Sequence, residues 1–383
     1  MKKQHIYNYQ FILVCLSSLF FSASYNMLIP ELPNYLSGLG GADYKGLIIA
    51  LFTLTAGLSR PFSGKLTDTI GRKPVLIFGA IICVITGVFY PILTSISGFL
   101  FLRLLHGFST GFSPTAIATY VSDIIPKEKL GEAMGIQGLC FSTGLALGPA
   151  LGSYIRLYSD YNMLFYSSSF IALISILLVL KVKETLLIKQ KFTFKSLLIS
   201  KKDIIAKEAL PAAIITFITY LGFGVVLTLI PDWSDALGIV NKGTFFIAFT
   251  ISSVFVRILA GKFSDVFGRT MVINIGLLFL VLALILLGVL NTINGMLVAA
   301  VFYGLAMGII SPTVNAWTID LSNPSSKGKA IATMYIALEA GIGLGALFSG
   351  WFYRNQIHNI PTTFYTCAFI GLLGFLYILK FRK

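Results

Sequence analysis

Charged side chains inside long apolar stretches are the positions at which this sequence could do chemistry. Glu339 lies in the otherwise uncharged stretch from Ile331 to Phe352, and Arg103 lies within another apolar stretch. A charge at the centre of a bilayer costs about 3 kcal/mol or more unless it faces water or a partner. A carboxylate held there can take up and release a proton, so Glu339 is the main candidate for proton exchange and Arg103 a candidate modulator.

Structural roles stay open for both residues. A hydroxyl or an arginine of a neighbouring helix could satisfy Glu339, and Arg103 could lie close enough to the outer end of its segment to snorkel to the surface. Most other acids of the apolar segments are expected at segment ends, which leaves Glu339 as the predicted midplane carboxylate. Those end residues are Glu31, Asp232, Asp123 and Asp320.

The composition places these residues in a membrane. Of 383 residues, 56% are hydrophobic and only 11% are charged, which is too little polar surface for a soluble protein of this size. A spanning helix needs about 20 mostly apolar residues, and we predict twelve of them, six in each half. The predicted spans are 9–29, 46–63, 75–94, 99–121, 132–155, 161–181, 209–231, 243–260, 271–290, 295–319, 330–352 and 361–381.

A polar loop signature occurs once in each half, between the second and third spans. Arg60-Pro-Phe-Ser-Gly-Lys-Leu-Thr-Asp68-Thr-Ile-Gly-Arg72 reappears from Arg257 to Arg269 with arginine, glycine, lysine and aspartate at matching positions. The sequence therefore predicts an all-α membrane protein built from two similar bundles, as in many secondary transporters. Its parts are the bundles 1–181 and 209–383 and a basic linker, 182–208.

The net charge of +14 is a signal of topology and does not indicate a nucleic-acid partner. If the N-terminus is cytoplasmic, only four basic residues fall on the outer side, Arg103 lies within a span, and all other lysines and arginines fall inside. We therefore expect both termini and the linker on the cytoplasmic side of the inner membrane, with the linker against anionic lipid headgroups. The four outer residues are Lys45, Arg156, Lys242 and Arg354.

The loop resembles that of the major facilitator superfamily, Gly-x-Leu-x-Asp-x-x-Gly-Arg-Lys, which is matched from Gly64 to Lys73. The second copy departs at Phe263 and Thr270. The resemblance covers essentially the whole chain. It implies the fold of that family, and a charge cluster on the cytoplasmic side of each half that latches the halves together. The clusters would be Asp68, Arg72 and Asp123, and Asp265, Arg269 and Asp320; alternatively, these charges merely anchor helix ends.

Two further motifs resemble that family. Arg103 followed by His106 and glycines resembles its span-4 motif, whose arginine is implicated in proton coupling, although glutamine is more usual where His106 stands. Gly144, Gly148, Pro149 and Gly152 resemble the span-5 motif associated with exporters. Because these glycines share one helix face, they could equally form a plain packing groove, and His106 could be a hydrogen-bonded packing residue.

The first span ends in a Pro-x-x-Pro element that resembles drug:proton antiporters of the same family. Asn26 stands where some polyspecific members carry an acid. Aromatic residues within spans would suit an apolar cavity for hydrophobic or cationic compounds. The candidate cavity residues among them are Tyr25, Tyr220 and Tyr335.

We therefore expect a monomeric antiporter that exports a small amphipathic compound, for example in multidrug efflux, as protons enter. Its partners would be the substrate, protons and membrane lipids. The alternatives are an uptake symporter or facilitator of the same fold for a sugar, organic anion or metabolite, and, more remotely, a membrane sensor or enzyme. The sequence has no phosphate-binding loop, no metal-spaced histidines or cysteines and no nucleophile with a base, so we expect no cofactor, no metal and no enzymatic activity.

Overall fold

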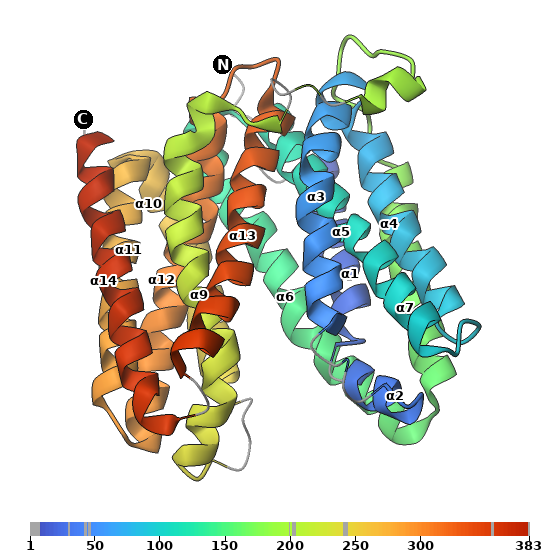
Figure 1. Cartoon of the computed structure of the whole chain (residues 1–383). Coiled ribbons are helices and arrows are strands. Elements are labelled where there is room, and N and C mark those ends of the chain that lie inside the picture. The colour runs from blue at the N-terminus through green and yellow to red at the C-terminus, as the bar shows by residue number, and fades with distance from the viewer. Residues whose placement is uncertain are drawn as a thin grey trace. The chain divides into compact units, whose positions relative to one another are not determined.

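The computed structural model describes residues 8–29, 31–41, 44, 47–198, 200, 204–239, 244–353 and 356–381. Within these ranges all regular elements are helices, which confirms the predicted all-α class, and a short helix, α2 (Leu32–Gly38), follows α1 (Figure 1). The long helices are α1 (Tyr9–Asn26), α3 (Leu47–Thr69), α4 (Arg72–Phe89), α5 (Ile96–Ile124), α6 (Leu130–Tyr158), α7 (Tyr161–Leu180), α9 (Leu210–Ala236), α10 (Thr244–Phe267), α11 (Arg269–Val289), α12 (Ile293–Leu321), α13 (Lys327–Tyr353) and α14 (Ile360–Ile378).

Most of the long helices are apolar enough to span a membrane. Among the described residues nine pass that test, and α10 makes a tenth although it bends by 44° between Arg257 and Leu259. Helices α1 and α5 are 18 and 29 residues long but carry many serines and threonines. Several of those hydroxyls are buried and bond to carbonyls of their own helix, as Ser24 does to Phe21. The prediction of twelve spans therefore stays a prediction.

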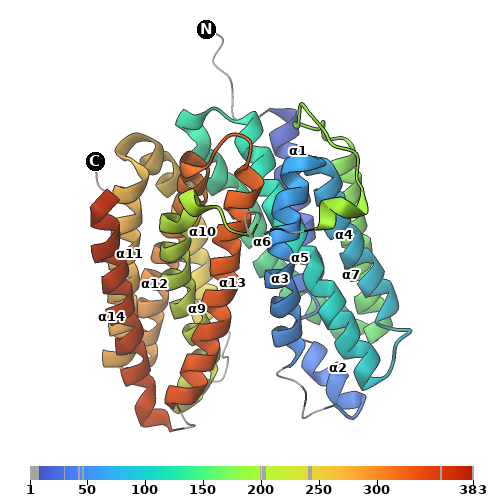
Figure 2. The ribbon, with the colours of Figure 1, turned by 45° about the horizontal axis from the view of Figure 1, so that its top comes forward.

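The residues group into two compact units. Unit 1 holds Met1–Pro126, Gln137–Ala206 and Ser322–Thr333, and unit 2 holds Lys127–Ile136, Lys207–Leu321 and Met334–Lys383. Each unit repeats the same helix pairs. In unit 1, α5 packs on α3 and α4, and α7 packs on α4 and α1; in unit 2, α12 packs on α10 and α11, and α14 packs on α11 and α9 (Figure 2). The duplicated sequence thus folds into duplicated packing.

Glycine and capping residues set the helix boundaries. Gly71 and Gly268 take φ values of 130° and 88° directly before α4 and α11, a conformation that side chains with a Cβ rarely adopt. The side chain of Ser95 accepts the Gly98 N–H at the start of α5, and Asp160 does the same for Met163 at the start of α7. Gly71 and Gly268 therefore permit the sharp turns between α3 and α4 and between α10 and α11.

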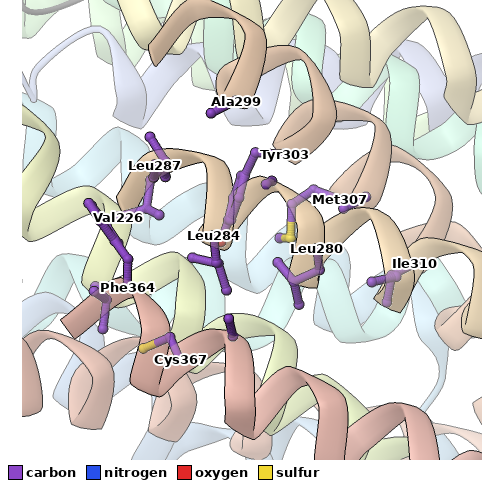
Figure 3. Packing of buried hydrophobic residues seen from close by; sticks show 14 of the residues in the cluster. Val226, Leu280, Leu284, Leu287, Ala299, Tyr303, Met307, Ile310, Phe364 and Cys367 are labelled. Atoms are coloured by element: carbon purple, nitrogen blue, oxygen red, sulfur yellow. The ribbon is translucent and has the colours of Figure 1, made fainter. Parts of the chain in front are cut away.

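The core of unit 2 is apolar and continuous. Leu280, Leu284 and Leu287 of α11 are buried against Tyr303 and Met307 of α12, with Val226 of α9 and Phe364 of α14 beside them (Figure 3). Because lipid is as apolar as these side chains, close packing rather than hydrophobic exclusion must hold such helices together.

The glycines of α6 form the groove that the sequence predicted. A Cβ at Gly144, Gly148 or Gly152 would meet the carbonyl oxygen of Leu19, Ala23 or Met27 of α1, respectively. The equivalent pair in unit 2 uses the same device, since Gly341 and Gly345 of α13 lie against the backbone of α9. The packing function of the span-5 motif is therefore present, whether or not the motif also signals export.

The start of the linker is docked on unit 1. The backbone N–H of Lys183 donates to Gln10, its carbonyl accepts from the Tyr120 hydroxyl at 2.8 Å, and Gln190 N–H donates to the Thr69 carbonyl at 2.8 Å. A short turn, Phe194–Leu197, contacts α3. These contacts tie part of the linker to protein, where the sequence predicted only lipid headgroups.

Sidedness can be tested with cysteine variants. Leu187 in the linker is 97% exposed, and Ser159 lies exposed between α6 and α7. In intact cells, a membrane-impermeant maleimide should label Ser159→Cys and leave Leu187→Cys unlabelled until the membrane is opened, because the positive-inside rule places them on opposite sides. Labelling of Leu187→Cys in intact cells would contradict the predicted orientation.

Candidate functional site

The first predicted charge cluster comes together in unit 1; we call Asp68, Arg72 and Asp123 the N-terminal latch. Arg72 Nε donates to Asp123 Oδ2 at 2.8 Å, and the arginine side chain is only 5% exposed. Asp68 does not ion-pair with Arg72. Its two carboxylate oxygens instead accept the backbone N–H groups of Gly328 and Lys329, at 2.8 and 2.9 Å. Both amides belong to the first turn of α13, which begins at Lys327.

The second cluster, Asp265, Arg269 and Asp320, forms the C-terminal latch in unit 2. Arg269 bonds to both acids, reaching Asp320 Oδ2 at 2.8 Å. Asp265 accepts the backbone N–H groups of Gly131 and Glu132 at 2.8 and 2.9 Å, at the start of α6. Each latch therefore binds the start of a helix that the other half of the sequence encodes.

This geometry follows from the chemistry of a helix start. The first N–H groups of a helix have no partner within the helix, and they carry the positive end of its dipole. One aspartate that accepts two of them satisfies two donors with charge-assisted hydrogen bonds. The interaction needs only a free helix start and a carboxylate in reach.

Two glycines of the sequence are a signal for these helix starts, which the loop motif alone does not include. Gly131 and Gly328 stand at matching positions of the two halves, like the loop glycines Gly64 and Gly261. A Cβ at Gly328 would lie 2.7 Å from the Gly64 carbonyl oxygen, and one at Gly131 would lie 2.5 Å from the Gly261 carbonyl oxygen. The paired glycines let the backbones approach until the aspartates reach the amides.

Two additional groups strengthen the N-terminal latch. Asp123 also accepts from Lys327 Nζ at 3.0 Å and from the Thr185 hydroxyl at 2.6 Å. Glu184 accepts the backbone N–H groups of Arg72 and Lys73, at 3.1 and 3.0 Å, and so caps α4. Glu184 and Thr185 belong to the linker, which the sequence predicted to lie against lipid headgroups.

The predicted cavity residues of unit 1 gather around a residue that the sequence did not single out, Phe52 of α3. The Arg103 guanidinium lies 4.6 Å from the centre of the Phe52 ring, and the rings of Tyr25 and His106 lie 5.9 and 5.6 Å from it. Arg103 is 1% exposed and donates to the Ile48 carbonyl at 2.9 Å. Its burial argues against snorkelling.

His106 and Asn26 are held more like packing residues than like exchangeable proton carriers. His106 is fully buried, with Nδ1 3.4 Å from the Tyr90 hydroxyl and no hydrogen-bond partner for Nε2 among the described residues. The Asn26 amide donates to the Ser22 carbonyl of its own helix at 2.8 Å.

The predicted cavity residues of unit 2 lie on α9 and α13. Tyr220 of α9 packs against the apolar core of the unit, and so does Tyr335, which lies one helical turn before Glu339 on α13. Tyr220 and Ser311 of α12 line the same small recess.

The recess is small, with about 10 Å³ of space, which is room for one water molecule. Glu339 is half-buried near the middle of α13, and Gly343, one turn on, has open space where a Cβ would be. Apolar side chains and a few polar groups line the recess. Its lining residues are Thr216, Tyr220, Ile310, Ser311, Val314, Asn315, Met334 and Leu338.

Comparison with known proteins decides the family. The sequence pattern described as Major Facilitator Superfamily matches residues 14–210 and 212–383, nearly the whole chain. The chain belongs to this superfamily. Members of the major facilitator superfamily are membrane transporters, so the chain is a multi-pass transporter of small molecules and not an enzyme, and its fold is the major facilitator fold.

Individual relatives match over most of their length. The chain is 26% identical to "Multidrug resistance protein 2" of Bacillus subtilis over 97% of this chain and 95% of that protein. It is 24% identical to "Multi-drug resistance efflux pump PmrA homolog" of Lactococcus lactis over 86% and 84%. Among solved structures, the human organic anion transporter MFSD10 matches the fold with a TM-score of 0.85 at 19% identity, over 97% and 99% of the two chains.

The two latches should differ in strength. Asp123 is 15% exposed and accepts from three side chains, whereas Asp320 is 31% exposed and is bonded by Arg269. Asp123→Asn should therefore destabilise the protein by about 2 kcal/mol or more, and Asp320→Asn by less than about 1 kcal/mol. Thermal unfolding in detergent measures both. Equal losses would mean that the extra partners of Asp123 contribute nothing.

Proposed function

We propose that this transporter is a proton-coupled antiporter that exports small amphipathic compounds from the cell. The observation that carries the proposal is Glu339, a half-buried carboxylate near the middle of α13, next to Leu338 at the wall of the recess. A carboxylate at that depth is costly unless it has a function or a partner. Binding and release of a proton there would supply the coupling step.

The names of the relatives support the direction of transport. Both full-length bacterial relatives described above are named for multidrug resistance, one of them explicitly as an efflux pump. Export also fits the glycine and proline motif of α6. We place the protein as a monomer in the cytoplasmic membrane with both termini inside, although residues 1–7 and 382–383 lie outside the described part of the chain.

The latches would act as the cytoplasmic gate. Helix α13 begins in unit 1, where Asp68 holds its first amides, and continues into unit 2 from Met334; α6 does the reverse. Release of Asp68 and Asp265 would free both helix starts at once. Alternating access requires such contacts to form in one state and break in the other.

The transport cycle would then use one proton site and one energy source. Ionised Glu339 takes up a proton from the outside, and the neutral side chain loses its attraction for positively charged neighbours or substrate. After the cavity opens inward, the proton leaves and a new substrate molecule enters. No cofactor is required, because the proton gradient drives each turn.

Replacement of Glu339 tests this proposal. Glu339→Gln mimics the protonated acid and cannot cycle, so proton-driven flux of a fluorescent cation in proteoliposomes should fall to the level of protein-free liposomes while substrate binding persists. Glu128→Gln, an exposed carboxylate in the turn before α6, is the matched control and should retain full flux.

Two results would contradict the proposal. Undiminished proton-driven flux in Glu339→Gln, at equal reconstituted protein, would return Glu339 to a structural hydrogen-bonding role. Transport of substrate and protons in the same direction by the wild-type protein would show that it is a symporter, the alternative that the sequence left open.

A further inference from the structure

The first part of the linker, residues 183–198, lies against the end of α3, and we call this segment the strap. The Gln190 N–H donates to the Thr69 carbonyl at 2.8 Å, and Lys65 Nζ donates to the Leu198 carbonyl at 2.8 Å. Lys65 and Thr69 flank the latch aspartate in the α3 sequence. The strap therefore binds α3 on both sides of the carboxylate that holds the start of α13.

The linker also bonds to the other parts of the N-terminal latch. In the strap, Glu184 caps the start of α4, and the Thr185 hydroxyl donates to Asp123 near the end of α5. Beyond the strap, the Ala206 N–H donates to the Thr333 hydroxyl of α13 at 2.9 Å. Each helix that meets in this latch is thus hydrogen-bonded to the linker.

In the second half an ion pair stands where the first half uses the strap. Lys262 Nζ lies 3.2 Å from Glu132 Oε1, and this pair joins α10 to the first turn of α6 beside the C-terminal latch. The residues at the matching positions of the first half are Lys65 and Lys329. Because both are cations, they repel each other and cannot form that pair. The Lys65 ammonium group donates to the strap instead.

The backbone around these matching positions has the same geometry in both halves. A Cβ at Gly64 would lie 3.1 Å from Lys329 Cα, and one at Gly261 would lie 3.0 Å from Glu132 Cα. The halves therefore differ here in side-chain charge and not in helix packing. The first half lacks the ion pair that holds the matching helices of the second half together.

We propose that the strap is a part of the cytoplasmic gate, because it holds Asp68 in the position from which the carboxylate binds the start of α13. It does for Asp68 what the ion pair of Lys262 does for Asp265. The strap contributes the backbone groups of Gln190 and Leu198 to this contact, so its release separates no pair of opposite charges and would loosen the N-terminal latch alone. Its role in transport rests on the proposed function of the latches, but its effect on Asp68 can be measured without transport.

Hydrogen exchange in the purified full-length protein tests the proposal with two strap variants. Lys65→Met removes the side-chain donor to the strap, and Gln190→Pro removes the backbone donor from it. Each should speed exchange in the peptide 322–333 by about fivefold, the usual effect of losing one hydrogen bond. Each should leave the peptide 127–136 unchanged, because that peptide belongs to the C-terminal latch.

A matched control lies at the equivalent position of the second half. Lys262→Met removes the ion pair with Glu132, so it should speed exchange in 127–136 and leave 322–333 unchanged. Peptides from the apolar core of α11 and α12 should exchange at the wild-type rate in all three variants, which verifies that each one is folded.

A rescue variant distinguishes support of the latch from a general loss of order. Lys329→Glu gives the first half the charges of the second, so that Lys65 can pair with the introduced carboxylate. Combined with Gln190→Pro, it should return exchange at the Gly328 amide to within about twofold of the wild-type rate, because the ion pair then replaces the strap.

The proposal is overturned if both strap variants leave exchange in 322–333 unchanged, because the strap would then be only a tether. It is also overturned if 322–333 and 127–136 speed up alike, or if Lys329→Glu restores no protection. These measurements use no proton gradient and are independent of coupling. A selective effect in a protein without proton-driven flux would uphold the strap and reject the antiport mechanism, and flux without a selective effect would do the opposite.

Discussion

An unpaired backbone amide at the start of a helix needs an acceptor, and this constraint organises both halves of the protein. Asp68 and Asp265 each satisfy two such amides, at the starts of α13 and α6. The carboxylates have few alternatives, since water is scarce near packed helices and each acid lies beside close-packed glycines. The ion pairs of Arg72 and Arg269 then hold the loops that present the aspartates. The charge clusters are therefore best understood as holders of helix starts.

The same constraint connects the gate to the binding region. The α13 segment that begins at the Asp68 carboxylate carries Tyr335 and Glu339 further along, so a change at one end of the helix can reach the other. The N-terminal latch also holds the linker through Glu184 and Thr185, whereas the described part of the C-terminal latch relies on Arg269. The two latches thus share one geometry, but the N-terminal latch has more hydrogen-bond partners. The repeated loop specifies the shared geometry, and Glu184 and Thr185 add the further bonds in the first half.

Much of the fold followed from the sequence because its signals are local or repeated. Apolar runs predicted helices, the duplicated loop predicted paired bundles, and the matching acids Asp123 and Asp320 identified the third member of each latch. The sequence did not predict that Asp68 accepts backbone amides, because every residue type except proline has such an amide. The matched glycines Gly131 and Gly328 were the available signal.

Hydrogen exchange at the helix starts tests the central claim most directly, because it reads the amides themselves. The account predicts that Asp68→Asn speeds exchange at Gly328 and Lys329 and leaves Gly131 and Glu132 protected, and that Asp265→Asn does the reverse. Peptides that cover 322–333 and 127–136 resolve the two sites by mass spectrometry of the full-length protein in detergent. Exchange that is unchanged at Gly328 and Lys329 in Asp68→Asn would contradict the account, because the carboxylate would then not be what holds the start of α13.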